Sequence, residues 1–151
     1  MIEERLDELG ITLPVPPKPA GSYIPVVKTG SLLFVSGQIP MKEGKVVFQG
    51  KVPSSISIED AQKAAKLCTI NALAQIKAEL DTLDKISRIV KVSGFVNSSQ
   101  DFVEQPKIIN AASDLLFEIF GDKGKHSRIA VGVASLPLNS SVEIDLIVEI
   151  N

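Results

Sequence analysis

The chain has 151 residues, of which 44% are hydrophobic and only 5% aromatic, and its formal net charge is −2. This length fits one domain of ordinary size with a sizeable, mainly aliphatic core. The acidic balance argues against a dedicated nucleic-acid binder, because neutralising phosphates requires a basic surface. No stretch reaches the roughly 18 apolar residues of a membrane span. With a single cysteine, the composition favours a soluble, cytoplasmic protein without an intrachain disulfide.

The N-terminal residues predict a leader, residues 1–19, that precedes one domain over residues 20–151. Residues 2–9 form a helical pattern that Gly10 ends, as expected for a glycine just past a helix. The proline-rich run 14–19 follows and predicts extended, irregular chain.

The domain itself begins with a predicted hairpin, strands 23–28 and 31–38, around Thr29-Gly30. A short strand over 45–48 comes next. A long helix then starts near Ser57, which with Asp60 resembles a capping box. A strand over 86–97, a helix over 104–120 and two closing strands complete the chain. This order predicts an α+β fold, a mixed sheet of about six strands with two helices packed on one face.

Two helices cover only one face of such a sheet. We expect the other face to be apolar and to carry Phe95, Ala130, Gly132, Ala134 and Ile147. An exposed apolar patch of that size is unusual in a monomer. The pattern therefore predicts self-association, and binding sites in such assemblies often lie in clefts between subunits.

The sequence lacks the common cofactor and metal motifs. It contains no GxxxxGK[ST] and no GxGxxG, and its single histidine, His126, cannot build a zinc site alone. We expect His126 to be exposed in a loop. Cys68 falls in the middle of a helix among apolar residues, which favours a buried structural thiol over a nucleophile. Any catalysis is expected to need neither metal nor cofactor.

Arg128 and Glu143 are the candidate catalytic pair. Arginine can clamp a carboxylate with two parallel hydrogen bonds, and a partly desolvated glutamate can act as general acid and base. The residue types alone also fit a solvated surface pair, and Asp145 fits a solvated strand edge. Four further candidates, each with an ordinary structural role as the alternative, are Tyr23, Ser36, Gly37 and Asn110.

Several segments, in order, resemble the Rid family, also called YjgF or "endoribonuclease L-PSP". The matching segments are GSYIPVVKTGSLLFVSGQIP (21–40), VKVSGFVNSSQDF (90–102), the helix containing Asn110, and SRIAVGVASLPLNSSVEIDLIVEI (127–150). The resemblance implies a chorismate-mutase-like fold, assembled as a homotrimer with sites at the subunit interfaces. Residues 1–19 suggest a subgroup with an N-terminal extension.

The resemblance also implies roles for individual residues. Arg128, in RIAVGV, would bind the substrate carboxylate, and Glu143 would position or activate water. The position two after the arginine, often Cys in the family, is Ala130, which argues against thiol chemistry. The implied substrate-binding residues are Tyr23, Ser36, Gly37 and Asn110, together with Arg128.

The implied reaction is hydrolysis of a reactive 2-imino or 2-enamino acid, of the 2-aminoacrylate type, to a 2-keto acid and ammonia. Two alternatives stay open. One is an endoribonuclease acting as a translation inhibitor, which the acidic balance and single histidine disfavour. The other is a non-catalytic regulatory protein that binds a small carboxylate and needs Arg128 but not Glu143.

Overall fold

The structure, a computed structural model, describes residues 1–16 and 21–151. The predicted proline-rich run 14–19 therefore lies partly outside the described residues. The α-helices are α1 (Ile2–Glu8), α2 (Ile58–Leu80) and α3 (Gln105–Phe120). The strands are β1 (Val26–Thr29), β2 (Leu32–Gln38), β3 (Met41–Lys42), β4 (Lys45–Val46), β5 (Ile86–Asn97), β6 (Ser127–Val133) and β7 (Val142–Ile150). Short 3-10 turns are η1 (Leu83–Lys85), η2 (Gly121–Gly124) and η3 (Pro137–Asn139).

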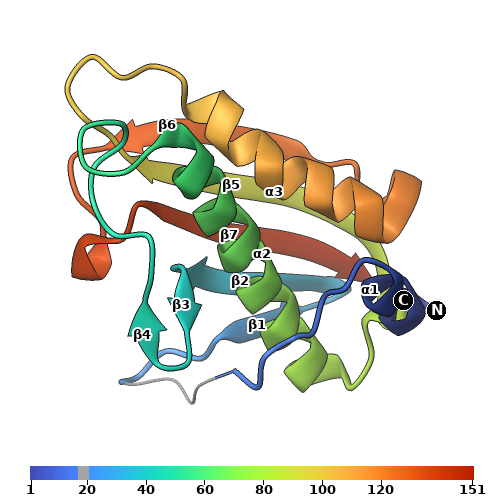
Figure 1. The fold of residues 1–151 in the computed structure, drawn as a ribbon. Coiled ribbons are helices and arrows are strands. Elements are labelled where there is room, and N and C mark those ends of the chain that lie inside the picture. Colours follow the sequence, from blue (N-terminus) through green and yellow to red (C-terminus); the bar gives the residue numbers. More distant parts are fainter. Residues whose placement is uncertain (17–20) are drawn as a thin grey trace.

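The main sheet has the strand order β1-β2-β7-β5-β6 in the described part of the chain. Adjacent strands of this sheet are antiparallel except β5 and β6, which run parallel. Helices α2 and α3 lie together across one face (Figure 1). The predicted α+β fold with two helices on one face of a mixed sheet is confirmed. The sheet has five strands rather than about six, because β4 pairs only with β3 in a separate hairpin.

The core lies between the sheet and the two long helices. Ser57 caps α2 by accepting a hydrogen bond from the Asp60 backbone N–H at 3.1 Å. The small residues of α2 let this helix approach the sheet closely, and they are fully buried: Ala61, Ala64, Ala65, Cys68 and Ala72. Burial raises the pKa of the Cys68 thiol well above its usual value. The interpretation of Cys68 as a structural thiol fits this environment.

Helix α3 packs on β5 at a position where β5 has no side chain. A Cβ on Gly94 would lie 2.6 Å from two atoms of Ile109, which is fully buried. Any larger residue at position 94 would therefore push α3 away from the sheet. This packing fixes the height of α3 above β5 and its neighbour β6.

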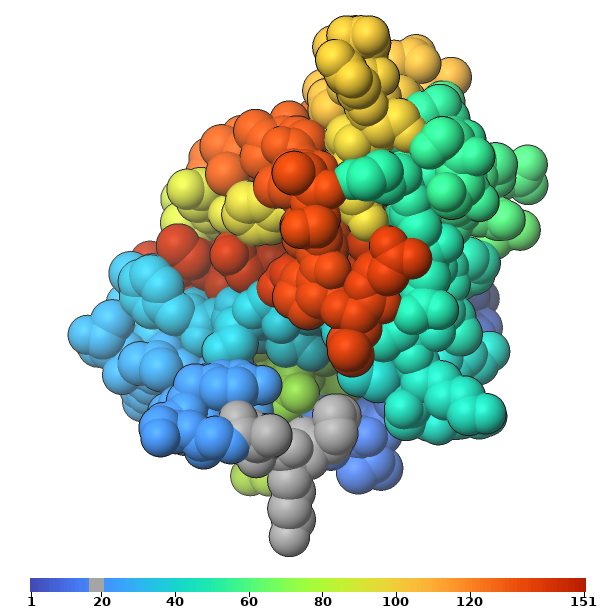
Figure 2. All heavy atoms as spheres, turned by 90° about the vertical axis from the view of Figure 1, so that its left-hand side faces the viewer, coloured from blue at the N-terminus to red at the C-terminus, as the bar shows by residue number. Residues whose placement is uncertain are grey.

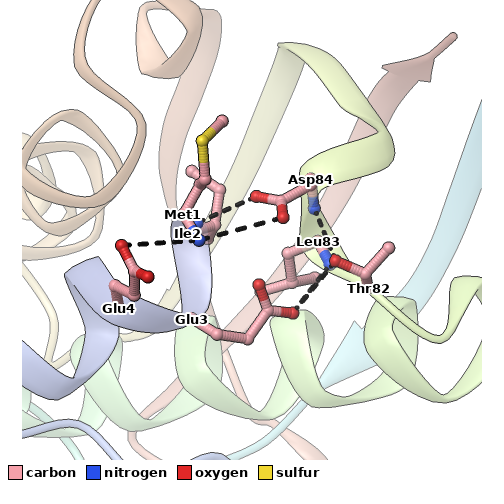
Figure 3. Close-up of polar contacts among 7 residues, drawn as sticks. All are labelled: Met1, Ile2, Glu3, Glu4, Thr82, Leu83 and Asp84. Atoms are coloured by element: carbon pink, nitrogen blue, oxygen red, sulfur yellow. Dashed lines mark hydrogen bonds and ion pairs between the residues drawn. The ribbon is translucent and has the colours of Figure 1, made fainter.

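Helix α1 docks on the turn between α2 and β5 (Figure 3). Glu3 Oε1 accepts hydrogen bonds from the Leu83 backbone N–H at 3.1 Å and the Thr82 hydroxyl at 3.2 Å. The Ile2 backbone N–H donates to Asp84 Oδ1 at 2.8 Å. Leu6 is 3% exposed and belongs to the core. The helix is thus tied to the rest of the fold by both polar and apolar contacts.

The face of the sheet opposite the helices, which we call the open face, is apolar and partly exposed. It carries large side chains from five strands: Val27, Phe34, Phe95, Ile129, Val131 and Ile147. Four of these are at least 40% exposed: Val27, Phe34, Ile129 and Val131. The predicted apolar second face therefore exists.

Its predicted membership was partly wrong. Ala130 pairs with Gly94 and packs against the core, so it faces the helices. Gly132 lies on the same side, because a Cβ there would lie 2.6 Å from Nε2 of Gln105 in α3. Ala134 lies beyond the end of β6. Phe95 and Ile147 are placed as predicted.

In the described residues, no helix is both long enough and apolar enough to cross a membrane.

Candidate functional site

Arg128 is the second residue of β6, which lies at one edge of the sheet, and its side chain points to the helix side. Its register partner on β5 is Val92, a core residue. The guanidinium Nη1 donates to Asn110 Oδ1 at 2.8 Å and to Ser113 Oγ at 3.2 Å, both on α3. Among the described residues, no carboxylate forms an ion pair with Arg128. Its positive charge is therefore held by neutral oxygens and stays available to an anion.

A second layer of contacts supports this arginine. His126 Nε2 lies 2.8 Å from Ser113 Oγ, and His126 Nδ1 lies 2.6 Å from the Gly124 carbonyl oxygen. His126 is half-buried, so the expectation of an exposed loop histidine was wrong. Ser113 on α3 thus supplies the hydroxyl that contacts His126. A pocket of about 320 Å³ opens here, lined by Ser113, Phe117, Gly124, Lys125, His126 and Arg128.

Glu143 lies on β7 and points to the open face, beside Phe95 of β5. Burial raises the pKa of the Glu143 carboxyl, and repulsion from Asp145 raises it further. A raised pKa brings a carboxyl closer to a balance between its acid and base forms at neutral pH, which is what proton transfer in both directions requires. The role of Glu143 as a general acid and base stays a prediction.

A bulge in β2 makes room for this carboxyl group. Val35 pairs with Leu146 and Gln38 with Ile144, so β2 has one extra residue at Ser36-Gly37. A Cβ on Gly37 would overlap Glu143 Oε2 and would lie 3.0 Å from Cδ. Glycine is therefore needed at position 37 for close approach rather than for its backbone angles.

Ser36 and Tyr23 lie at the same end of β2. The Ser36 hydroxyl donates to the Ile24 carbonyl at 3.0 Å, and the Ser36 backbone N–H donates to the Pro25 carbonyl at 2.8 Å. These bonds attach the segment containing Tyr23 to the bulge. Tyr23 itself is 58% exposed, so it does not cap the core and its ring is free for contact with another molecule.

Lys51 and Asn97 fix the loop that leads into β7. Lys51 Nζ donates to Asn97 Oδ1 at 3.0 Å and to the Ala134 carbonyl, and Asn97 Nδ2 donates to the Ser140 carbonyl at 3.1 Å. The segment around η3 thereby lies against residues 48–55 at this end of the molecule (Figure 2). The loop's position determines where Glu143 enters the sheet.

The six predicted site residues therefore form two groups. The first, the arginine group, contains Arg128 and Asn110. The second, the glutamate group, contains Glu143, Gly37, Ser36 and the nearby Tyr23. Strand β5 separates β6 from β7, so the strands that carry Arg128 and Glu143 run about 10 Å apart at a strand spacing of about 4.8 Å. The two residues are also offset along the sheet, because Arg128 pairs with Val92 of β5 and Glu143 pairs with Phe95. Their side chains also point to opposite faces, so Arg128 and Glu143 of one chain do not face a common ligand.

Sequence reasoning missed Ser113, His126 as a partner of Ser113, and Lys51. A signal for Ser113 was present, because it lies three residues after Asn110 and so on the same face of the helix. No sequence signal marked Lys51, whose contacts depend on two loops that are distant in the chain.

Comparison with known proteins places this geometry in a family. Residues 3–150 match the family described as "YjgF/chorismate_mutase-like, putative endoribonuclease". The protein TCP17 of Trypanosoma cruzi is 41% identical over 151 residues, covering 99% of this chain and 94% of TCP17. The 2-iminobutanoate/2-iminopropanoate deaminase of Dermatophagoides farinae is 32% identical over 141 residues, with 93% and 94% of the two chains covered.

Among solved structures, the protein Atu1372 of Agrobacterium tumefaciens, described as having unknown function, superposes with a TM-score of 0.93 at 52% identity. The match covers 99% of this chain and 92% of that one. A family match over nearly the whole chain, together with these relatives, leads to one conclusion: the chain belongs to the YjgF/chorismate-mutase-like family, the Rid family that its sequence resembles.

Proposed function

We propose that the protein is an enamine/imine deaminase that hydrolyses 2-imino and 2-enamino acids to 2-keto acids and ammonia. The observation that carries the proposal is the guanidinium of Arg128, a half-buried residue. Neutral oxygens hold this guanidinium in a pocket, and no carboxylate of the described residues neutralises it. Such a group favours a carboxylate ligand, bound with two parallel hydrogen bonds. The deaminase activity named for the Dermatophagoides farinae relative agrees with this substrate class.

The proposed reaction needs only a group that accepts and donates a proton and groups that hold the carboxylate and the water. The carbon of a protonated imine is already electrophilic, so water adds to it once a base removes a proton. Glu143 accepts that proton, which leaves a carbinolamine, and then donates it to the nitrogen. The nitrogen leaves as ammonia while the carbinolamine hydroxyl returns its own proton to Glu143 and the carbonyl forms. The raised pKa of Glu143 suits both steps. Holding the carboxylate and the water in place supplies the remaining acceleration.

We further propose that each active site joins two subunits of a homotrimer. Two observations support this. The arginine group and the glutamate group lie on different faces of one chain, so a site that uses both needs a second chain. The open face also presents Phe34, Ile129 and Val131 at 40% or more exposure, and burial between subunits would remove that apolar surface from water.

The test generates 2-iminopropionate or 2-iminobutanoate in the assay from an amino acid and an amino-acid oxidase. Release of keto acid and ammonia is followed above the spontaneous rate. Wild type should accelerate release, whereas Arg128→Ala and Glu143→Ala should not. Arg88→Ala on β5 and Glu149→Ala on β7, which make the same changes at positions outside both groups, are the matched controls and should behave like wild type. No acceleration by wild type would refute the deaminase proposal.

A second candidate is a non-catalytic protein that binds a small carboxylate. The separation of the two groups favours it, because the arginine group can hold a carboxylate without any contribution from Glu143. Binding of pyruvate that needs Arg128 but is unchanged by Glu143→Ala, without turnover of either imine, would establish this alternative.

A further inference from the structure

We propose that Ser113 and His126 are positioning residues that orient the Arg128 guanidinium through a directed hydrogen-bond chain. The proposal rests on the proposed function, since it concerns the group that would hold the substrate carboxylate. It assigns a role to two side chains that the family resemblance leaves without one. Three side-chain contacts between α3, η2 and the start of β6 support it.

The last acceptor, the Gly124 carbonyl oxygen, determines which group donates and which accepts in each hydrogen bond. A carbonyl oxygen only accepts hydrogen bonds, so the 2.6 Å contact between His126 Nδ1 and the Gly124 oxygen requires a proton on Nδ1. In the neutral imidazole, Nε2 is then an acceptor. The Ser113 hydroxyl, 2.8 Å away, must donate to it. The tautomer of His126 is thus set by the backbone of Gly124.

The orientation of the Ser113 hydroxyl determines whether its oxygen can accept a hydrogen bond from Arg128. With its proton directed at His126, the oxygen of Ser113 presents its lone pairs elsewhere and accepts from Arg128 Nη1 at 3.2 Å. Asn110 Oδ1 accepts the second Nη1 proton at 2.8 Å. Both N–H groups of Nη1 are therefore used within the protein.

The other edge of the guanidinium remains free to bind a ligand. Arginine has five N–H donors, so the Nε edge and Nη2 keep three for a ligand. A carboxylate binds such an edge side-on, with two parallel bonds. The chain from Gly124 through His126 and Ser113 thus selects which edge of Arg128 faces the pocket.

Gly124, which ends the hydrogen-bond chain, is held in place by packing. A Cβ on Gly124 would overlap the backbone oxygen of Leu116 in α3, so the glycine lies directly against that helix and is buried. The acceptor for His126 and the donor to it, Ser113, are therefore attached to the same helix. Movement of the η2 turn relative to α3 would break the chain.

The first test is a direct measurement of the histidine. ¹⁵N NMR of the imidazole in the wild-type protein should show the neutral tautomer protonated on Nδ1. A tautomer protonated on Nε2 would overturn the proposal, because Ser113 would then be unable to donate to His126. This readout does not depend on activity.

The second test separates positioning from folding and from the proposed reaction. Ser113→Ala and His126→Leu should each raise KM for the imine and the dissociation constant of pyruvate by about fivefold to tenfold, with kcat changed less. Ser113→Thr and His126→Gln, which keep a hydroxyl and an acceptor, should restore both values. Lys123→Ala, an exposed change in η2, is the control and should have no effect.

Because His126 acts only through Ser113, the double variant should bind pyruvate no more weakly than Ser113→Ala alone. Additive losses, or unchanged pyruvate binding in both single variants, would overturn the proposal. Pyruvate binding that follows this pattern without imine turnover would instead retain the positioning roles and refute the deaminase reaction.

Discussion

Gly37→Ala tests the contact between the β2 bulge and the Glu143 carboxyl. The new Cβ would overlap Oε2, so the carboxyl group must rotate away, at a cost of about 1 kcal/mol for a side chain forced off its preferred torsion. Replacing a glycine whose backbone angles suit alanine stabilises a protein by about 0.4–1 kcal/mol through the unfolded state. The two effects nearly cancel, so Gly37→Ala should change the free energy of unfolding by less than about 0.5 kcal/mol. The proposed deaminase activity should fall by about 10²-fold, because the carboxyl group is displaced.

A double-mutant cycle isolates the contact. In a Glu143→Ala background the overlap is absent, and Gly37→Ala should stabilise the fold by the full 0.4–1 kcal/mol, which gives a coupling energy of about 1 kcal/mol. Denaturant unfolding at one fixed protomer concentration measures all four proteins. Gly94→Ala is the control, because its clash with Ile109 lies on the other side of the sheet and should not couple to Glu143. Equal effects of Gly37→Ala in both backgrounds, or full activity of Gly37→Ala, would refute the reasoning.

Three further changes test the burial of single groups. Burial raises the pKa of Glu143, so the stabilisation tied to its protonated form is complete below about pH 4 and is lost as the pH rises through the folded-state value. Glu143→Gln should accordingly raise Tm above neutral pH and leave it unchanged below about pH 4; an equal effect at both would contradict the pKa shift. Gly94→Ala should destabilise the fold by about 1–3 kcal/mol, measured by denaturant unfolding, because its Cβ would overlap the fully buried Ile109. Glu3→Ala should cost about 1–3 kcal/mol in the same assay by leaving a buried backbone N–H unsatisfied, whereas Glu4→Ala, at an exposed position, should cost nothing measurable, and equal effects would contradict the docking of α1.

The elements with strong periodicity could be predicted from the sequence. The apolar stripe from Ala61 to Leu80 indicated α2, and its Ser57 cap indicated where the helix begins. The alternation of Val142 to Ile150 indicated β7 and placed Glu143 on the face opposite the core. These signals come from short stretches of sequence, so they do not depend on which strands pair in the folded sheet.

The faces of β6 were harder to predict. Ile129 and Val131 alternate with Ala130 and Gly132, so both sides of the strand read as apolar or small and no polarity contrast chooses the buried side. Only the parallel register with β5, a tertiary contact, places Ala130 against the helices and Ile129 on the open face.

The same limit applies to the candidate site. Residue types and family resemblance indicated Arg128, Asn110 and Glu143. That Asn110 would bond Arg128 while Glu143 faced the other way follows from the register of three strands. The role of His126 depends on a turn that brings Gly124 against α3, which no local pattern encodes.

Subunit mixing tests whether Arg128 of one subunit and Glu143 of a neighbour together hydrolyse the imine. Arg128→Ala and Glu143→Ala chains, each inactive alone, are unfolded together and refolded as a one-to-one mixture. Random assembly pairs an intact Arg128 with an intact Glu143 at about one site in four, so the mixture should regain about one quarter of wild-type activity. Mixing Arg128→Ala with Asn110→Ala, two changes within the arginine group, should regain none. An inactive mixture of Arg128→Ala and Glu143→Ala that assembles like wild type would contradict the shared site.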